Sequence, residues 1–200
     1  MTVVEEILAT GSLAEIGKLV RTGKTSVTEV AEWYLGTIDR DNHAGRGINA
    51  VRHVASGVLE SALQLDRELA SGIDRGPLHG IPVLLKNNVM VGAEFATSAG
   101  LQALADFRPR SRATLVNRLH KAGALIIGTT NLTELADYVS DTMPAGFNSA
   151  GGFVRNPFGI EYGRGQGSSI GSAAAVAAGF APVAMGSETQ NSIQAPASVS

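Results

Sequence analysis

The chain of 200 residues contains no cysteine. This absence excludes disulfide bonds, thiolate zinc sites, iron–sulfur clusters and a cysteine nucleophile together. The oxidation state of the surroundings is therefore expected to have no effect on the fold.

An excess of basic residues is also absent. Lysine and arginine number 16 against 18 aspartates and glutamates, which gives a formal net charge of -2. Proteins that bind nucleic acid or anionic membranes show a basic excess, so we expect neither partner and favour a small molecule. The four histidines (positions 43, 53, 79 and 120) match no H-x-x-x-H or H-E-x-x-H pattern. We expect no metal site and no cofactor.

Long apolar runs are missing as well. The opening MTVVEEILAT has two glutamates where a secretory signal needs a basic start and an unbroken apolar stretch. The most apolar stretch, residues 173–185, consists of small residues interrupted by Gly179 and Pro182, which is unsuited to crossing a membrane. These absences predict a cytoplasmic protein.

Apolar side chains are nevertheless plentiful: 44% of residues are hydrophobic and 17% charged, which is typical of a globular chain with its own core. Ser12 with Glu15, and Ser26 with Glu29, have the spacing of the capping box that begins a helix. A third helix is predicted over residues 58–70, where leucines recur at helical spacing. Residues 1–72 are therefore predicted to form a helical layer.

The remainder, residues 73–200, alternates short apolar runs with helical patterns. Strands are predicted at 81–85, 124–127 and 181–185, with helices at 113–120, after Asn131 and Glu134, and at 172–178. Such alternation indicates crossover connections. We predict one structural domain of the α/β class, with a mixed, largely parallel sheet covered by helices.

A glycine-rich stretch, residues 146–172, is longer than an ordinary connector and is typical of a functional loop. Its GRGQGSSIGS segment lacks the lysine of a P-loop and breaks the dinucleotide G-x-G-x-x-G pattern, which disfavours nucleotide binding. No G-x-S-x-G elbow is present, and His79 lies in a turn-like GPLHG segment. A serine nucleophile would therefore need a base other than histidine.

Three segments together resemble one family. GPLHGIPVLLKNN, GQGSSIGSAAAVAAG and GSETQNSIQAPAS are similar, in order and spacing, to the lysine, glycine–serine and nucleophile blocks of the amidase-signature family. GALIIGTTNLTELA resembles the strand and helix between them, so the resemblance covers roughly residues 12–200. It implies a catalytic triad of Lys86, Ser168 and Ser192, with a cis peptide before Ser168. Taken singly, Ser168 could instead cap the following helix, and Lys86 could be a surface charge.

The chemistry gives an independent reason for these residue types. A serine hydroxyl is a weak nucleophile, and a neutral lysine amine is the remaining candidate base. Lowering a lysine pKa from about 10.4 to near 7 requires burial, which the end of an apolar strand such as Leu84–Leu85 can provide. Ser168 can relay the proton because a hydroxyl both donates and accepts. Backbone N–H groups of an expected oxyanion hole come from Thr189, Gln190, Asn191 and Ser192.

The sequence departs from the family pattern at several positions. Gln190 and Asn191 replace the usual glycines, Gln194 replaces a common arginine, and Asn87 replaces a common aspartate. The resemblance implies an enzyme that cleaves the carbon–nitrogen bond of an amide, anilide or carbamate through an acyl-enzyme. TMPAGFNSAGGFVRNPF is more similar to peptide-amidase-type members than to transamidation subunits.

Two alternatives stay open: a glutaminase subunit of a tRNA-dependent amidotransferase, or a non-catalytic relative. The family's core continues beyond the nucleophile block, so we expect the 200 residues to be part of a longer protein. Association into a homo-oligomer is compatible with the sequence, which identifies no surface for it.

Overall fold

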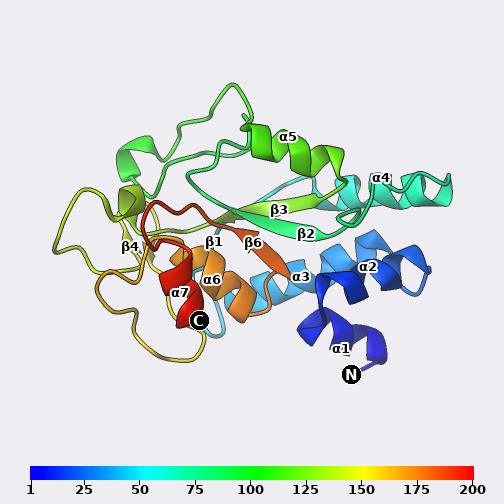
Figure 1. Ribbon diagram of the computed structural model, residues 1–200, viewed down its shortest axis with the longest axis horizontal. Coiled ribbons are helices and arrows are strands. Elements are labelled where there is room, and N and C mark those ends of the chain that lie inside the picture. Colours follow the sequence, from blue (N-terminus) through cyan, green and yellow to red (C-terminus); the bar gives the residue numbers. More distant parts are fainter.

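The computed structural model describes residues 1–200, and its main element is a four-stranded sheet between helices (Figure 1). No helix is long and apolar enough to cross a membrane. The helices and strands are, in order, α1 (Val3–Thr10), α2 (Leu13–Arg21), α3 (Val27–Asp41), β1 (Val51–Val54), α4 (Val58–Ala70), β2 (Pro82–Lys86), α5 (Thr114–Lys121), β3 (Leu125–Thr130), β4 (Phe147–Asn148), β5 (Gly152–Phe153), α6 (Ile170–Ala177), β6 (Val183–Met185) and α7 (Gln194–Ser198).

The predicted helix starts are confirmed. Ser12 and Ser26 each accept a hydrogen bond from the backbone N–H of the glutamate three residues later, and that glutamate bonds back to the serine N–H. Two orphan amides at each helix start are thereby satisfied. Thr2 and Glu5 form a third capping box at α1, a helix that the sequence analysis did not identify.

The sheet has the strand order β1-β3-β2-β6. Strands β3, β2 and β6 run parallel, whereas β1 pairs antiparallel with β3 at one edge. The prediction of a mixed, largely parallel sheet is confirmed. Strand β1 was not predicted, and it lies within residues 1–72, for which the sequence predicts a helical layer.

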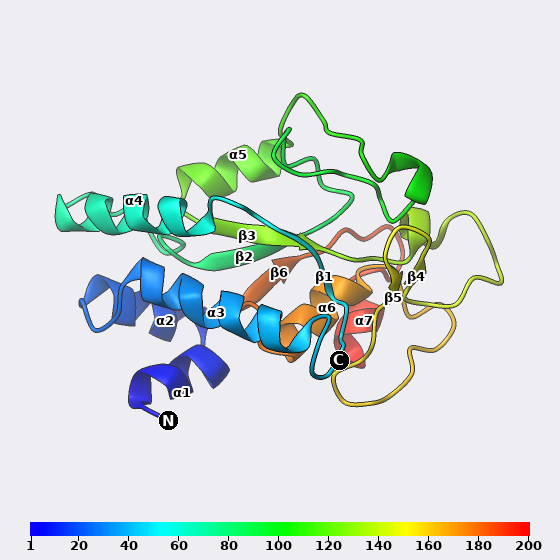
Figure 2. The same cartoon turned by 180° about the vertical axis from the view of Figure 1, so that it is seen from behind.

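Alternating side chains of β2 and β3 enter two hydrophobic cores on opposite faces of the sheet. Leu84, Leu125 and Ile127 join the larger core with apolar residues of α1, α2, α3, α4 and α6. Val83 and Ile126 join a smaller core with α5. Figures 1 and 2 show α5 on one side of the sheet and α1, α2, α3 and α6 on the other. Burial on both faces explains why β2 and β3 read as continuous apolar runs.

The predicted helix cap at Asn131 and Glu134 is wrong. Residues Glu134–Asp137 form a short 3-10 turn in which Leu135 and Ala136 adopt positive φ angles of 45° and 59°. The Glu134 carboxylate accepts from the Ser149 N–H and the Asn131 N–H donates to the Ala50 carbonyl, so the bond from Asn131 N–H to Glu134 that a capping box needs is not formed. Tertiary hydrogen bonds have displaced the local capping pattern.

Candidate active site

The three parallel strands end at the same edge of the sheet. Lys86 at the end of β2 lies opposite Thr130 at the end of β3, and Leu85 lies opposite Met185 at the end of β6. Segments that leave these strands are therefore brought together, which is where open α/β sheets usually form their sites. Helix α6 begins beside this edge, and Gly171 in its first turn makes a close approach: a Cβ there would lie 2.1 Å from the Asn131 carbonyl oxygen.

Lys86 is completely buried, so its alternative reading as a surface charge is wrong. Its Nζ donates to Ser168 Oγ at 2.6 Å, to Ser187 Oγ at 3.0 Å and to the Ser187 carbonyl at 3.2 Å. No carboxylate forms an ion pair with it. Desolvation in this setting lowers the pKa of Lys86 to about 8, because burial disfavours the charged ammonium.

Ser168 is also fully buried and lies on a cis peptide bond with Gly167. Its carbonyl accepts from the Thr133 N–H at 3.0 Å. A Cβ at position 167 would lie 2.6 Å from Thr133 Oγ1, so glycine is required for this close approach. The Ser168 side chain does not cap α6; the N-cap position belongs to Ser169, whose side chain makes no capping bond.

The backbone of Ser192 lies near Ser168 in the fold, but the Ser192 side chain bonds to neither Ser168 nor Lys86. Its carbonyl accepts from the Ser169 N–H at 2.9 Å, which places its backbone beside the glycine–serine loop. Its hydroxyl makes no hydrogen bond to Ser168 or to Lys86. The structure thus brings together two of the three predicted catalytic side chains, and the role of Ser192 stays a prediction.

The predicted oxyanion-hole segment is an open turn. The backbone N–H groups of Thr189, Gln190, Asn191 and Ser192 donate to no group of the chain. Glu188, Thr189, Gln190 and Asn191 are exposed, and Ser192 is half-buried. These N–H groups are therefore free to donate to a ligand oxygen.

Glu188 fastens this turn. Its Oε2 accepts from the backbone N–H groups of Ile193 at 2.7 Å and Gln194 at 2.8 Å, and its Oε1 accepts from the Gln194 side chain at 3.0 Å. The hydrogen bonds from Gln194 N–H and Ile193 N–H hold the pKa of Glu188 below its ordinary value. The side-chain amide of Gln194 therefore bonds to the Glu188 carboxylate, at the position where the family resemblance implies an arginine.

Ser187 and Asn88 are site residues that the sequence analysis missed. The Ser187 hydroxyl accepts from Lys86 and, at 2.8 Å, from the Asn88 side chain. Ser187 follows the end of β6 by two residues, and β6 runs parallel to β2, which carries Lys86. This position indicates that Ser187 lies near Lys86, but only once the strand order is known, and the sequence does not contain the strand order.

Asn87 explains one departure from the family pattern. Its Nδ2 donates to the Ala96 carbonyl at 2.8 Å and to Thr129 Oγ1 at 3.1 Å, while its Oδ1 accepts from the N–H and hydroxyl of Ser98. A carboxylate would lack the donor for Ala96. The asparagine is thus matched to the loop that follows β2.

His79 has a structural role, as the sequence indicated. Its Nδ1 accepts from the Arg75 N–H at 3.1 Å, so its Nε2 carries the proton and donates to the Leu65 carbonyl at 3.1 Å. The ring is almost completely buried. Both of its ring nitrogens are bonded to backbone groups, and neither is bonded to Lys86.

The geometry is that of an α/β protein whose lysine–serine site lies at the carboxyl edge of its sheet. A model of the family described as Amidase matches residues 32–200, and the chain therefore belongs to the amidase family. The peptide amidase of Stenotrophomonas maltophilia aligns with a TM-score of 0.88 and 42% identity, over 94% of this chain and 38% of that chain. An amidase family protein of Bacillus anthracis gives a TM-score of 0.91 and 38% identity, over 96% and 38%.

Relatives by sequence include one component of the glutamyl-tRNA(Gln) amidotransferase of Symbiobacterium thermophilum. It is 40% identical over 187 residues, which are 93% of this chain and 36% of that protein. The chain spans about a third of the length of the curated relatives it matches.

Proposed function

We propose that the chain carries the catalytic centre of an amidase, a hydrolase that cleaves the carbon–nitrogen bond of an amide, anilide or carbamate. The observation that carries the proposal is the buried Lys86 amine, which lies 2.6 Å from Ser168 Oγ and has no acidic partner. With a pKa of about 8, about a tenth of the amine is neutral at pH 7 and can accept a proton, and this fraction rises with pH.

In the proposed reaction Ser192 Oγ attacks the substrate carbonyl while its proton passes to Ser168, whose own proton passes to Lys86. The tetrahedral intermediate collapses when the leaving nitrogen takes a proton back through Ser168, and an acyl-enzyme remains. Water then repeats the sequence and releases the acid. No cofactor enters the reaction.

Two features of the turn at 188–192 support this assignment. Its four free N–H groups suit a developing oxyanion, for which each donor lowers the barrier by about 3 kcal/mol. Its attachment to Ser169 places Ser192 beside the glycine–serine loop. For attack, the turn must bring the Ser192 hydroxyl into hydrogen-bond contact with Ser168.

The substrate class is supported by the solved relatives, one of which is a peptide amidase. Hydrolysis of primary amides, anilides, carbamates and glutamine by the wild type should be measured beside Ser192→Ala. We expect turnover of at least one amide or carbamate by the wild type only. Equal turnover by the two proteins, or labelling of neither by a serine-reactive phosphonate, would reject the proposal.

A second candidate is a glutaminase subunit of a tRNA-dependent amidotransferase. It is favoured by several curated relatives that are components of glutamyl-tRNA(Gln) amidotransferases and are 37% to 44% identical to this chain. A glutaminase of this kind works with partners and passes ammonia onward. Affinity purification from the source cell should recover a stable partner complex in that case, and glutamine should be hydrolysed in preference to anilides.

A further inference from the structure

A basic cavity of about 490 Å³ lies beside the start of β1, two strands away from Lys86 in the sheet, between residues 42–52 and the β4–β5 hairpin. Its lining includes Arg52, Arg155 and His43, and it includes no carboxylate. Residues 49 and 151 are joined across it by a hydrogen bond, and Figure 2 shows β1 close to β4 and β5. A concentration of positive charge is unexpected in a chain whose formal net charge is -2.

Arg52 is one of the two arginines that line this cavity. Its Nε is buried and has no hydrogen-bond partner, and its guanidinium forms no ion pair. Leaving a charged donor buried and unpaired is costly, because the desolvation of the group is not offset. Gly151 approaches it closely: a Cβ there would lie 3.2 Å from Arg52 Nη1 and 2.7 Å from Asn131 Oδ1.

Arg155 supplies a second guanidinium without a carboxylate partner. Its backbone N–H donates to the Ile48 carbonyl at 2.9 Å, which fixes the residue beside the segment that leads into β1. The neighbouring acid, Asp41, is already paired with Arg40 and Arg46. Neither arginine of the cavity therefore forms an ion pair within the chain.

The frame of the cavity is preorganised. Asn49 adopts a positive φ of 54°, and its Nδ2 donates to the Gly151 carbonyl at 2.7 Å and the Phe153 carbonyl at 2.9 Å. Asn42 donates through Nδ2 to the Val51 carbonyl and, at 3.0 Å, to His43 Nε2. His43 Nε2 is thus the acceptor, so the ring's proton is on Nδ1 and can be donated.

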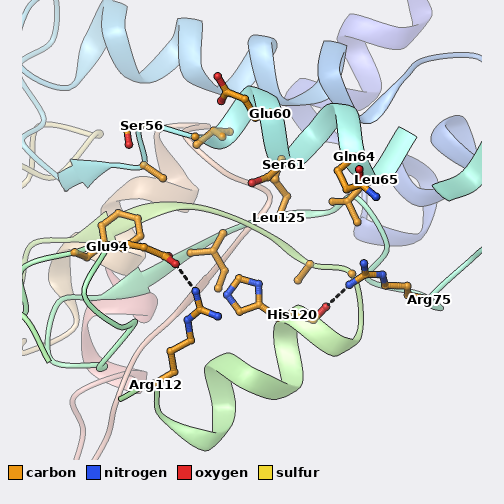
Figure 3. A pocket seen from close by; sticks show the side chains of 17 residues that line it. Ser56, Glu60, Ser61, Gln64, Leu65, Arg75, Glu94, Arg112, His120 and Leu125 are labelled. Carbon is orange, nitrogen blue, oxygen red and sulfur yellow. Dashed lines mark hydrogen bonds and ion pairs between the residues drawn. The ribbon is translucent and has the colours of Figure 1, made fainter. Parts of the chain in front are cut away.

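A second cavity, of about 680 Å³, shows the contrast (Figure 3). It lies between α4, α5 and the start of β3, and it also contains two arginines. There Arg112 pairs with Glu94 and Arg75 pairs with Glu68. The arginines of this cavity are neutralised within the fold, whereas those of the basic cavity are not.

We propose that the basic cavity is a binding site for a small oxyanion, either phosphate or carboxylate, held between Arg52 and Arg155. Guanidinium groups match the geometry of both anions and bind them through charge-assisted, often bidentate hydrogen bonds. The ligand supplies the counter-charge that the Arg52 guanidinium lacks within the chain. The site is distinct from the cluster at Lys86, because none of its lining residues belongs to that cluster.

The test is a titration of the ¹⁵N-labelled 200-residue chain with inorganic phosphate and, separately, with malonate, at ionic strength held constant with sodium chloride. We expect saturable shifts of the Gly47 and Gly151 amides with at least one anion, and the tighter binder identifies the source of the ligand. Absence of saturation with both, or shifts confined to residues 187–192, would overturn the proposal.

Substitutions of single arginines test which side chains contribute to anion binding. Arg52→Gln and Arg155→Gln should each weaken binding by about tenfold or more. Arg118→Gln is the matched control, because Arg118 is exposed on α5 and makes no side-chain hydrogen bond or ion pair, and it should bind like the wild type. An equal loss in all three variants would mean unspecific attraction and would reject the site. If Arg52→Gln does not fold, anion binding is measured with Arg52→Lys in its place, and the Gly47 and Gly151 shifts of the wild type still test whether the cavity binds an anion.

Discussion

The amine of Lys86 lies 2.6 Å from the hydroxyl of Ser168, although 82 positions separate the two residues in the chain. Both side chains are fully buried, and both are held by backbone at the carboxyl edge of the sheet. The short contact links the candidate base to the candidate relay. It leaves the position of the nucleophile as the main question for experiment.

Ser192→Ala should lower kcat/KM by about four orders of magnitude or more, because the nucleophile is removed. The free energy of unfolding should change by less than about 0.5 kcal/mol, since the Ser192 hydroxyl makes no hydrogen bond in the fold. Ser187→Ala is the informative companion: it removes an acceptor from Lys86 and should lower kcat/KM only about ten- to hundredfold. Kinetics that showed the reverse ranking would transfer the nucleophile assignment to Ser187.

Lys86→Ala should reduce kcat/KM by several orders of magnitude, with no recovery at alkaline pH. The missing base acts within the site, and hydroxide from solution does not reproduce its position. Lys121→Ala provides the control, because Lys121 is an exposed lysine at the end of α5. Rates should be measured from about pH 7 to 10. If added hydroxide restored the activity of Lys86→Ala, the lysine would act through its charge and not as the base.

The pH dependence of kcat/KM should rise through an apparent pKa of about 8, the value to which burial lowers the Lys86 amine. Below this pH the amine is protonated and cannot act as a base, so the rate falls about tenfold per pH unit. Ser168→Ala removes the 2.6 Å hydrogen bond, so it should slow the reaction and displace the limb. A flat profile with chemistry rate-limiting, or an unchanged Ser168→Ala profile, would speak against this proton path.

Lys86 should also make folding stability depend on pH. Its folded pKa of about 8 lies below the unfolded value of about 10.4, so between these limits the unfolded chain holds a proton that the folded chain has lost. Raising the pH through this window therefore increases the free energy of unfolding, by up to about 3 kcal/mol.

Denaturant unfolding of the wild type and Lys86→Met, from about pH 7 to 11, measures this effect. Only the wild type should gain stability from Lys86, and the difference between the two proteins should be constant below about pH 7. Parallel curves across the whole range would show that Lys86 is not perturbed by burial.

Two helical glycines should respond to alanine with opposite signs. Gly171→Ala in α6 places a Cβ 2.1 Å from the Asn131 carbonyl oxygen, so we expect a loss of about 3 kcal/mol or more, or failure to fold. At Gly36 in α3 nothing lies within 4 Å, so alanine should stabilise the chain by up to about 1 kcal/mol through helix propensity. Thermal unfolding compares the two, and an equal effect would mean that α6 does not pack closely on the sheet edge.

Local chemistry explains which parts of the fold were predictable. The capping boxes at Ser12 and Ser26 and the apolar strand ending at Lys86 involve neighbours in the chain, and their patterns are written in consecutive residues. The segment after Asn131 has the same type of pattern but forms a 3-10 turn, because the Asn131 N–H bonds to Ala50 and the Glu134 carboxylate bonds to Ser149 instead of to each other.

By itself the sequence determined the α/β class, the family resemblance, and the choice of Lys86, Ser168 and Ser192 as candidates. It also located the cis peptide through that resemblance, and the structure has it between Gly167 and Ser168. Only the tertiary structure decided that Ser187 joins Lys86, that β1 forms an antiparallel edge, and that Arg52 and Arg155 face one cavity without a counter-charge. Strand order and loop packing bring these groups together from distant parts of the chain, and neither spacing nor propensity encodes such long-range pairings.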